Sequence, residues 1–102
     1  MRVDESASGT EVRLHLRDVL EIVLAENPST GHGWQVLADG APASRLLADR
    51  FAPGSGALGA AGQRTFTFEA VAPGAASVDL AYARSFEEAE PARRFTIRLV
   101  VG

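Results

Sequence analysis

Apolar and polar residues alternate along most of this chain with the period of two that is typical of half-buried β-strands. The clearest case is the segment 94–101, in which Phe95, Ile97, Leu99 and Val101 occupy every second position. Five further segments share the alternation, and they are 12–16, 20–25, 34–38, 64–70 and 78–82. The sequence therefore predicts six strands.

Turn-forming pairs containing glycine, at 39–40, 53–54 and 73–74, separate several of these strands. The segment 44–51 fits either a seventh strand or a helical turn, because its apolar residues also match a helical spacing. Many short strands with regular turns favour an all-β sandwich or barrel. The length of 102 residues is typical of one domain, which we place at 1–102.

The apolar alternation also predicts the structural core. The largest inward-facing side chains are expected to be those of Trp34, Phe66, Phe68, Leu80, Tyr82 and Phe95.

Composition narrows the possible partners. The formal net charge of -3 argues against a nucleic-acid surface, and 46% apolar residues is ordinary for a globular protein. No segment has the length of a membrane helix, and the first residues lack the apolar core of a signal peptide. We therefore expect a soluble chain without membrane contact. Its compartment stays open between the cytoplasm and export after removal of a signal, since a chain without cysteine is indifferent to redox conditions.

Strand order places three unusual connections together. If consecutive strands run antiparallel, the connections 27–33, 52–63 and 83–92 leave the same end of the sandwich, whereas those at the other end are mostly tight turns. A rigid sandwich that presents three adjacent loops is the arrangement of recognition modules such as antibody variable domains. This layout favours a binding function.

The first connection begins with Asn27-Pro28, which favours a turn, and contains Gly31, which permits a positive φ. It could also be a simple connector that ends with Trp34 in the core. The second connection is rich in glycine, but it lacks the lysine of a phosphate-binding loop. In the third, Arg84 either belongs to a binding surface or lies in a solvated charge cluster with the nearby glutamates.

Catalysis is not indicated. Ser29 or Thr30 beside His32 has no carboxylate to orient the imidazole, so a nucleophilic triad is not formed. The two histidines, His15 and His32, have no spacing typical of a metal site. We therefore expect neither an enzyme nor a cofactor or metal.

Taken together, the three connections resemble the three motifs of the chagasin-type inhibitors of papain-like cysteine peptidases. The family motifs read Asn-Pro-Thr-Thr-Gly followed by an aromatic residue, any residue and Trp; then Gly-x-Gly-Gly; then Arg-Pro-Trp or Arg-Pro-Phe. In the same order this chain has Asn-Pro-Ser-Thr-Gly-His-Gly-Trp at 27–34, Leu-Gly-Ala-Ala-Gly at 58–62 and Tyr-Ala-Arg-Ser-Phe at 82–86.

The resemblance implies an immunoglobulin-like antiparallel β-sandwich of about seven strands, whose three loops occlude the active-site cleft of a papain-like cysteine peptidase. Inhibition would be reversible and non-covalent, by a monomer in a 1:1 complex without a cofactor. Carried over by position, the peptidase-binding residues would be Asn27, Pro28, Ser29, Thr30, Gly31, His32, Leu58, Gly59, Ala60, Ala61, Gly62, Arg84, Ser85 and Phe86.

The chain departs from the family pattern at three places. His32 replaces an aromatic residue, Ala61 replaces a glycine, and Ser85-Phe86 replaces Pro-Trp. The third loop thereby loses the rigidity of proline and some contact area. The alternative from another class is an immunoglobulin-like module that binds a protein or carbohydrate without inhibiting a peptidase.

Overall fold

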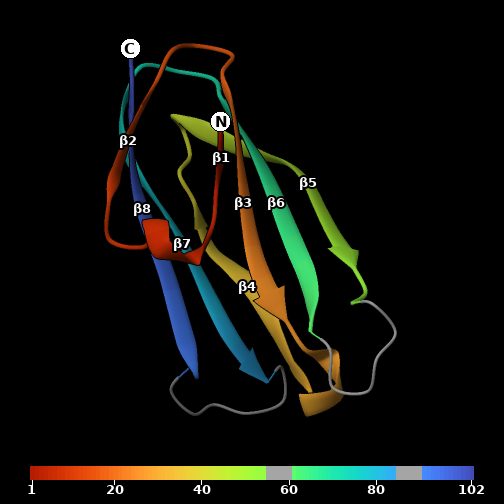
Figure 1. The fold of residues 1–102 in the computed structure, drawn as a ribbon. Coiled ribbons are helices and arrows are strands. Elements are labelled where there is room, and N and C mark those ends of the chain that lie inside the picture. Colours follow the sequence, from red (N-terminus) through yellow and green to blue (C-terminus); the bar gives the residue numbers. More distant parts are fainter. Residues whose placement is uncertain (55–60, 85–90) are drawn as a thin grey trace.

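The structure is a computed structural model that describes residues 1–54, 61–84 and 91–102, and in this part of the chain two four-stranded sheets pack face to face (Figure 1). The strand orders are β1-β3-β6-β5 and β2-β8-β7-β4. The bounds are β1 (Arg2–Val3), β2 (Glu11–Leu14), β3 (Val19–Glu26), β4 (His32–Asp39), β5 (Ser44–Ala52), β6 (Gly62–Ala70), β7 (Gly74–Arg84) and β8 (Arg93–Val101). The predicted immunoglobulin-like β-sandwich is confirmed.

The structure resolves the ambiguity at 44–51 in favour of a strand. Among the described residues, β5 pairs only with β6 and lies at the edge of its sheet. Most of its residues are exposed, and its register shifts between Leu46 and Ala48. A strand that is exposed on its outer edge and interrupted by a bulge has no strict alternation, which explains why the sequence also fitted a helical turn.

Two pairings differ from the purely antiparallel arrangement that the resemblance implied. β1 runs parallel to β3, and β2 runs parallel to β8. β2 also ends at Leu14, two residues before the predicted strand end. There the Asp18 carboxylate accepts a hydrogen bond from the His15 backbone N–H at 2.9 Å, and Arg17 adopts a φ of 73°. This turn carries the chain from one sheet to the other, so the alternation cannot continue.

The core lies between the two sheets and follows the period-two pattern. Of the six side chains expected there, those of Trp34, Phe66, Phe68, Leu80 and Phe95 are buried, whereas Tyr82 is half-buried. Further buried residues come from the same alternation on β3, β7 and β8, and they include Leu20, Ile22, Leu24, Val78, Ile97, Leu99 and Val101.

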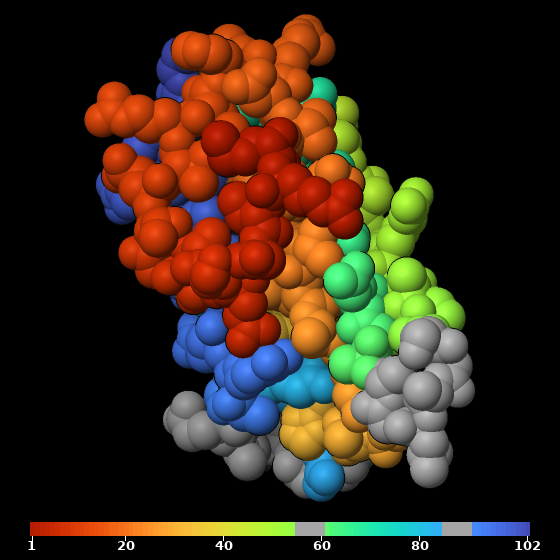
Figure 2. Space-filling view, viewed as in Figure 1, coloured from red at the N-terminus to blue at the C-terminus, as the bar shows by residue number. Residues whose placement is uncertain are grey.

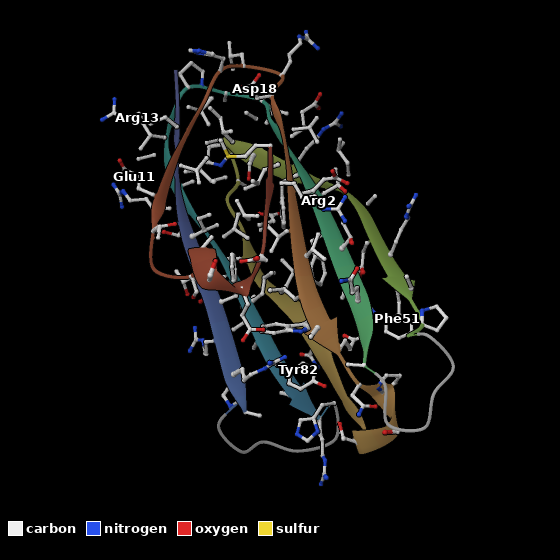
Figure 3. The ribbon with its side chains drawn as sticks, viewed as in Figure 1. Arg2, Glu11, Arg13, Asp18, Phe51 and Tyr82 are labelled. Carbon is white, nitrogen blue, oxygen red and sulfur yellow. The ribbon has the colours of Figure 1, made fainter. Side chains whose placement is uncertain are left out.

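The strand ends that flank the three unusual connections meet at one end of the sandwich, which is the lower end in Figure 1. The register agrees, because Glu26 pairs with Gly62, His32 with Arg84, and Tyr82 with Arg93. Figure 3 places Tyr82 near this end between the sheets, and Asp18 at the opposite end. The alternating strand directions thus bring these connections together as expected.

The N-terminal segment covers one side of the sandwich. In Figure 2 its first residues, in red, lie over β3 and beside β8. The turn η1 (Glu5–Ala7) joins β1 of one sheet to β2 of the other, and Ala7 packs against the core. The Asp4 carboxylate caps this turn, and hydrogen bonds from the Ser6 hydroxyl and backbone N–H lower the pKa of Asp4 below its usual value. The first residues therefore belong to the fold.

Helical structure is minor in the described residues. Besides η1 there is the turn η2 (Pro28–Thr30), and each has three residues. No helix found in the three described ranges is long and apolar enough to cross a membrane.

Phe95 is fully buried between the sheets, so we expect Phe95→Ala to lower the free energy of unfolding by about 3–5 kcal/mol through lost burial and a residual cavity. Urea denaturation monitored by Trp34 fluorescence measures this change. The control is Leu37→Ala, because Leu37 is 53% exposed, and its cost should stay below about 1 kcal/mol. Equal costs for the two variants would contradict the assignment of the core.

Candidate functional site

The connection between β3 and β4 forms a capped turn. Pro28 begins η2, and its fixed φ suits the first helical position. The Asn27 side-chain oxygen accepts hydrogen bonds from the Ser29 backbone N–H at 3.2 Å and from the Ser29 hydroxyl at 2.7 Å. Gly31 ends the turn with a φ of 79°, a left-handed conformation that glycine adopts at little cost. The sequence therefore specifies one conformation for this turn.

The hydroxyl of Thr30 links both sides of the turn. It donates a hydrogen bond to the Asn27 carbonyl at 2.9 Å and accepts one from the His32 backbone N–H at 3.3 Å. The Nδ1 atom of His32 lies 3.0 Å from the same oxygen. Pro28, Ser29, Thr30 and Gly31 are exposed, so the turn is held internally while its outer surface stays accessible.

Tyr82 and Arg84, both on β7, form hydrogen bonds with this turn. The Asn27 backbone N–H donates to the Tyr82 hydroxyl at 3.0 Å, and Arg84 Nε donates to the Thr30 carbonyl at 3.2 Å. The imidazole of His32 stacks on the Tyr82 ring with centroids 5.4 Å apart. The first motif segment is thereby fixed to the strand that leads into the third.

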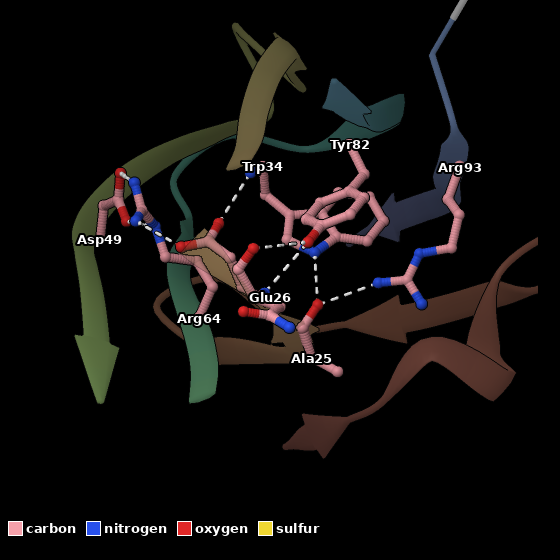
Figure 4. Close-up of polar contacts among 8 residues, drawn as sticks. Ala25, Glu26, Trp34, Asp49, Arg64, Tyr82 and Arg93 are labelled. Atoms are coloured by element: carbon pink, nitrogen blue, oxygen red, sulfur yellow. Dashed lines mark hydrogen bonds and ion pairs between the residues drawn. The ribbon is translucent and has the colours of Figure 1, made fainter. Parts of the chain in front are cut away.

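Beneath the turn, Trp34 joins the two sheets (Figure 4). Its indole N–H donates to the Ala25 carbonyl on β3 at 3.0 Å, and its backbone N–H donates to Oε1 of Glu26 at 2.8 Å. Glu26 is only 4% exposed, and its other carboxylate oxygen contacts Arg64. The tryptophan that closes the first motif is thus buried with its polar groups satisfied.

The predicted site residues of the second and third segments are described only in part. Ala61 is exposed, and Arg84 is half-exposed at the end of β7. Gly62 is buried as the first residue of β6. The other predicted residues lie outside the described ranges, and they are Leu58, Gly59, Ala60, Ser85 and Phe86.

Gly62 has a steric reason to be glycine. A Cβ atom at this position would lie 2.5 Å from the Ala52 carbonyl oxygen and 2.6 Å from the Phe51 ring. Such approaches force a backbone or side chain to move. The last glycine of the second motif therefore permits close approach of β5 and β6 where the second connection leaves the sheet.

Sequence reasoning missed the polar residues that support the site, chiefly Glu26, Arg64 and Arg93. In the sequence they read as ordinary polar residues at strand ends, since nothing in their spacing shows that they converge. The available signal was the rule that a buried Trp N–H needs an acceptor.

The described surface of this end presents backbone groups and small side chains. A shallow hollow beside the turn is lined by Pro28, Gly31, His32, Gly33, Trp34, Gln35 and Ala83. Across the part of the chain that the structure describes, no three His, Asp or Glu side chains are grouped so that they could hold a metal ion.

Comparisons with known proteins agree with this geometry. Residues 13–101 match the family described as chagasin family peptidase inhibitor I42. The crystal structure of the cysteine protease inhibitor EhICP2 from Entamoeba histolytica is similar, with 26% identity, a TM-score of 0.88, and coverage of 99% of this chain and 94% of that chain. The solution structure of amebosin is similar at 25% identity and a TM-score of 0.74, covering 99% and 96%.

A more distant likeness concerns the fold alone. PbICP-C, solved in complex with falcipain-2, is 16% identical with a TM-score of 0.70, and the match covers 99% of this chain and 98% of that chain. A search of curated proteins gave no match.

We expect Gly62→Ala to lower the free energy of unfolding by about 1–3 kcal/mol, because its Cβ would overlap the Ala52 carbonyl. Gly33→Ala is the matched control, since a Cβ there meets Glu26 Oε1 at an ordinary 3.5 Å. Chemical denaturation of both variants compares the two costs. A Gly62→Ala variant as stable as Gly33→Ala would show that the backbone approach is not needed.

Proposed function

Because the chain belongs to the chagasin family of peptidase inhibitors, we propose that it inhibits papain-like cysteine peptidases by placing the 27–33 end of its sandwich in their active-site cleft. The similar protein EhICP2 is a cysteine protease inhibitor, and the match covers 99% of this chain. The family is one of inhibitors, so the chain itself is not an enzyme.

The observation that carries the proposal is the exposed turn 27–31, which is held by its own hydrogen bonds. An inhibitor loop that is already ordered avoids the entropy loss that a flexible peptide pays on binding. Strong internal bonding also keeps the loop from adopting the extended form that a peptidase cleaves. The turn therefore has the properties of an inhibitory loop rather than of a substrate.

We assign the contact surface as the family motifs indicate. Ser29, Thr30 and Gly31 face the catalytic centre of the peptidase, and His32 lies beside them. The segment 58–62 contacts one side of the cleft, and the segment 84–86 contacts the other. The inhibitor acts as a monomer in a 1:1 complex, since these segments leave from one end of one chain.

Non-covalent inhibition follows from the chemistry of the turn. The Ser29 and Thr30 hydroxyls are both engaged as hydrogen-bond donors to Asn27 oxygens. The nucleophile of a cysteine peptidase is its own catalytic thiolate, and these hydroxyls offer it hydrogen bonds but no electrophile to attack. The rival function, a sandwich that binds proteins or carbohydrates without inhibition, does not account for a family match over residues 13–101.

We expect the chain to inhibit papain competitively and reversibly, because the proposed contact surface occludes the cleft. Steady-state hydrolysis of a fluorogenic peptide, titrated with the chain from nanomolar to micromolar concentration, measures the inhibition constant. Trypsin serves as the control and should be unaffected. Papain activity that stays unchanged at micromolar inhibitor would refute the proposed function.

Loss of the Thr30 hydroxyl should weaken inhibition, because the hydroxyl ties Asn27 to His32. We expect Thr30→Val to raise the inhibition constant for papain by about fivefold to tenfold, corresponding to one lost hydrogen bond. Thr10→Val is the matched control, since the Thr10 hydroxyl donates to a carbonyl three residues earlier, in an exposed turn outside the site. Equal inhibition by both variants would remove the Thr30 hydroxyl from the mechanism.

A further inference from the structure

Two arginines lie at the base of the end that carries the proposed inhibitory surface (Figure 4). Arg64 is the third residue of β6, and Arg93 is the first residue of β8. Each follows one of the unusual connections, but neither belongs to a motif segment. Their side chains are 26% and 39% exposed, respectively, so both guanidinium groups are partly withdrawn from solvent.

Arg64 links the strands that flank the first connection to the strands that flank the second. Its NH1 donates to Glu26 Oε2 at 3.1 Å, and its NH2 donates to Asp49 Oδ2 at 3.2 Å. The opposite oxygen of Glu26 accepts the backbone N–H of Trp34, which closes the first motif. The chain of contacts therefore runs from β4 through Glu26 on β3 and Arg64 on β6 to Asp49 on β5.

Arg93 links the strand that follows the third connection to the strand ends that flank the first. Its NH2 donates to the Ala25 carbonyl at 2.9 Å, the same carbonyl that accepts the Trp34 indole N–H. Its guanidinium carbon lies 5.3 Å from the Trp34 ring centroid and 4.7 Å from that of Tyr82. Its NH1 also donates to Glu5 at 3.3 Å.

These bonds fix the two sheets relative to each other, which the backbone hydrogen bonds within each sheet do not do. Backbone ladders fix neighbouring strands within a sheet, whereas the packing between sheets is apolar and non-directional. Arg93 bonds from one sheet to the other, and Arg64 holds the carboxylate that does the same. A planar guanidinium with several donors is suited to such a junction, and bonds to charged groups are the stronger ones.

Two other arginines form ion pairs that do not link the two sheets. Arg45 pairs with Glu69 across β5 and β6, and Arg94 pairs with Asp79 across β7 and β8. Each of these ion pairs joins adjacent strands of one sheet, which the backbone ladder already holds. They provide controls with the same change in charge, since Arg94 lies on β8 beside Arg93, and Arg45 and Glu69 form an ion pair on β5 and β6.

We infer that Arg64 and Arg93 are positioning residues, which hold the strand ends that flank the three connections in the relative orientation that a peptidase cleft accepts. The inference rests on the proposed function. Without either arginine, these strand ends would sample other relative orientations, and only a fraction of molecules would be ready to bind. A smaller competent fraction lowers the association rate constant, whereas loss of a direct contact would mainly raise the dissociation rate constant.

The test compares Arg93→Gln with Arg94→Gln, and the double variant Arg64→Gln/Glu26→Gln with Arg45→Gln/Glu69→Gln. The double variants leave no unpaired buried carboxylate, because Glu26 becomes neutral and Asp49, which also loses its Arg64 partner, has a side chain that is 37% exposed. Biolayer interferometry on immobilised papain gives both rate constants. Hydrogen exchange of the backbone amides in 27–35 of the free protein reports how readily this segment opens, independently of any peptidase.

We expect the Arg93 and Arg64/Glu26 variants to associate about tenfold more slowly with dissociation changed by less than about twofold, and to exchange these amides faster. The control variants should match the wild type in all three measurements. Association and exchange like the wild type, even with a lower melting temperature, would overturn the inference and leave the arginines a structural role. Faster dissociation alone would also overturn it.

If wild-type protein does not bind papain, the proposed function fails. The hydrogen-exchange rates of the amides in 27–35 then test by themselves whether the two arginines position the strand ends. Faster exchange in the Arg93 and Arg64/Glu26 variants than in their controls supports the role. Equal exchange overturns it.

Discussion

Apolar packing between two sheets is the constraint on which the rest of this structure depends. Every second residue of the inner strands faces the partner sheet, and Leu20, Ile22, Phe66, Leu80 and Phe95 are buried there. From β3 to β8 consecutive strands alternate in direction, with β3, β5 and β6 in one sheet and β4, β7 and β8 in the other. The unusual connections share one end because of that alternation, so the position of the candidate site follows from the core.

At the end of the sandwich, apolar packing gives way to polar contacts. Trp34 is the last large apolar residue toward the turn, and its N–H groups must find acceptors. Ala25 and Glu26 provide them, and the arginines then satisfy the carbonyl and the carboxylate. A buried carboxylate is costly when it is unpaired, so this cluster must be assembled as a whole. That requirement links the strand ends beneath the connections.

The inner strands β3, β6, β7 and β8 could be predicted from the sequence, because each is buried on one face and its apolar residues keep a period of two. The sequence was less informative for β5, because the side chains of an exposed edge strand need not alternate between apolar and polar. It was also less informative for β1, because a strand of two residues shows no period. The turn at 27–31 could be predicted, since Asn27-Pro28 and Gly31 have local conformational preferences. The cluster around Glu26 could not, because its members come from five strands and meet only after folding.

The departure at His32 shows how local and tertiary preferences combine. The family motif has an aromatic residue at this position, and the imidazole retains a flat ring that stacks on Tyr82. Unlike a phenyl ring, it also places a nitrogen 3.0 Å from the Thr30 hydroxyl. Tyr82 in turn accepts the Asn27 N–H, so His32, Thr30, Asn27 and Tyr82 form a closed ring of contacts around the turn. His32 therefore stacks on Tyr82 and adds a polar contact within the turn.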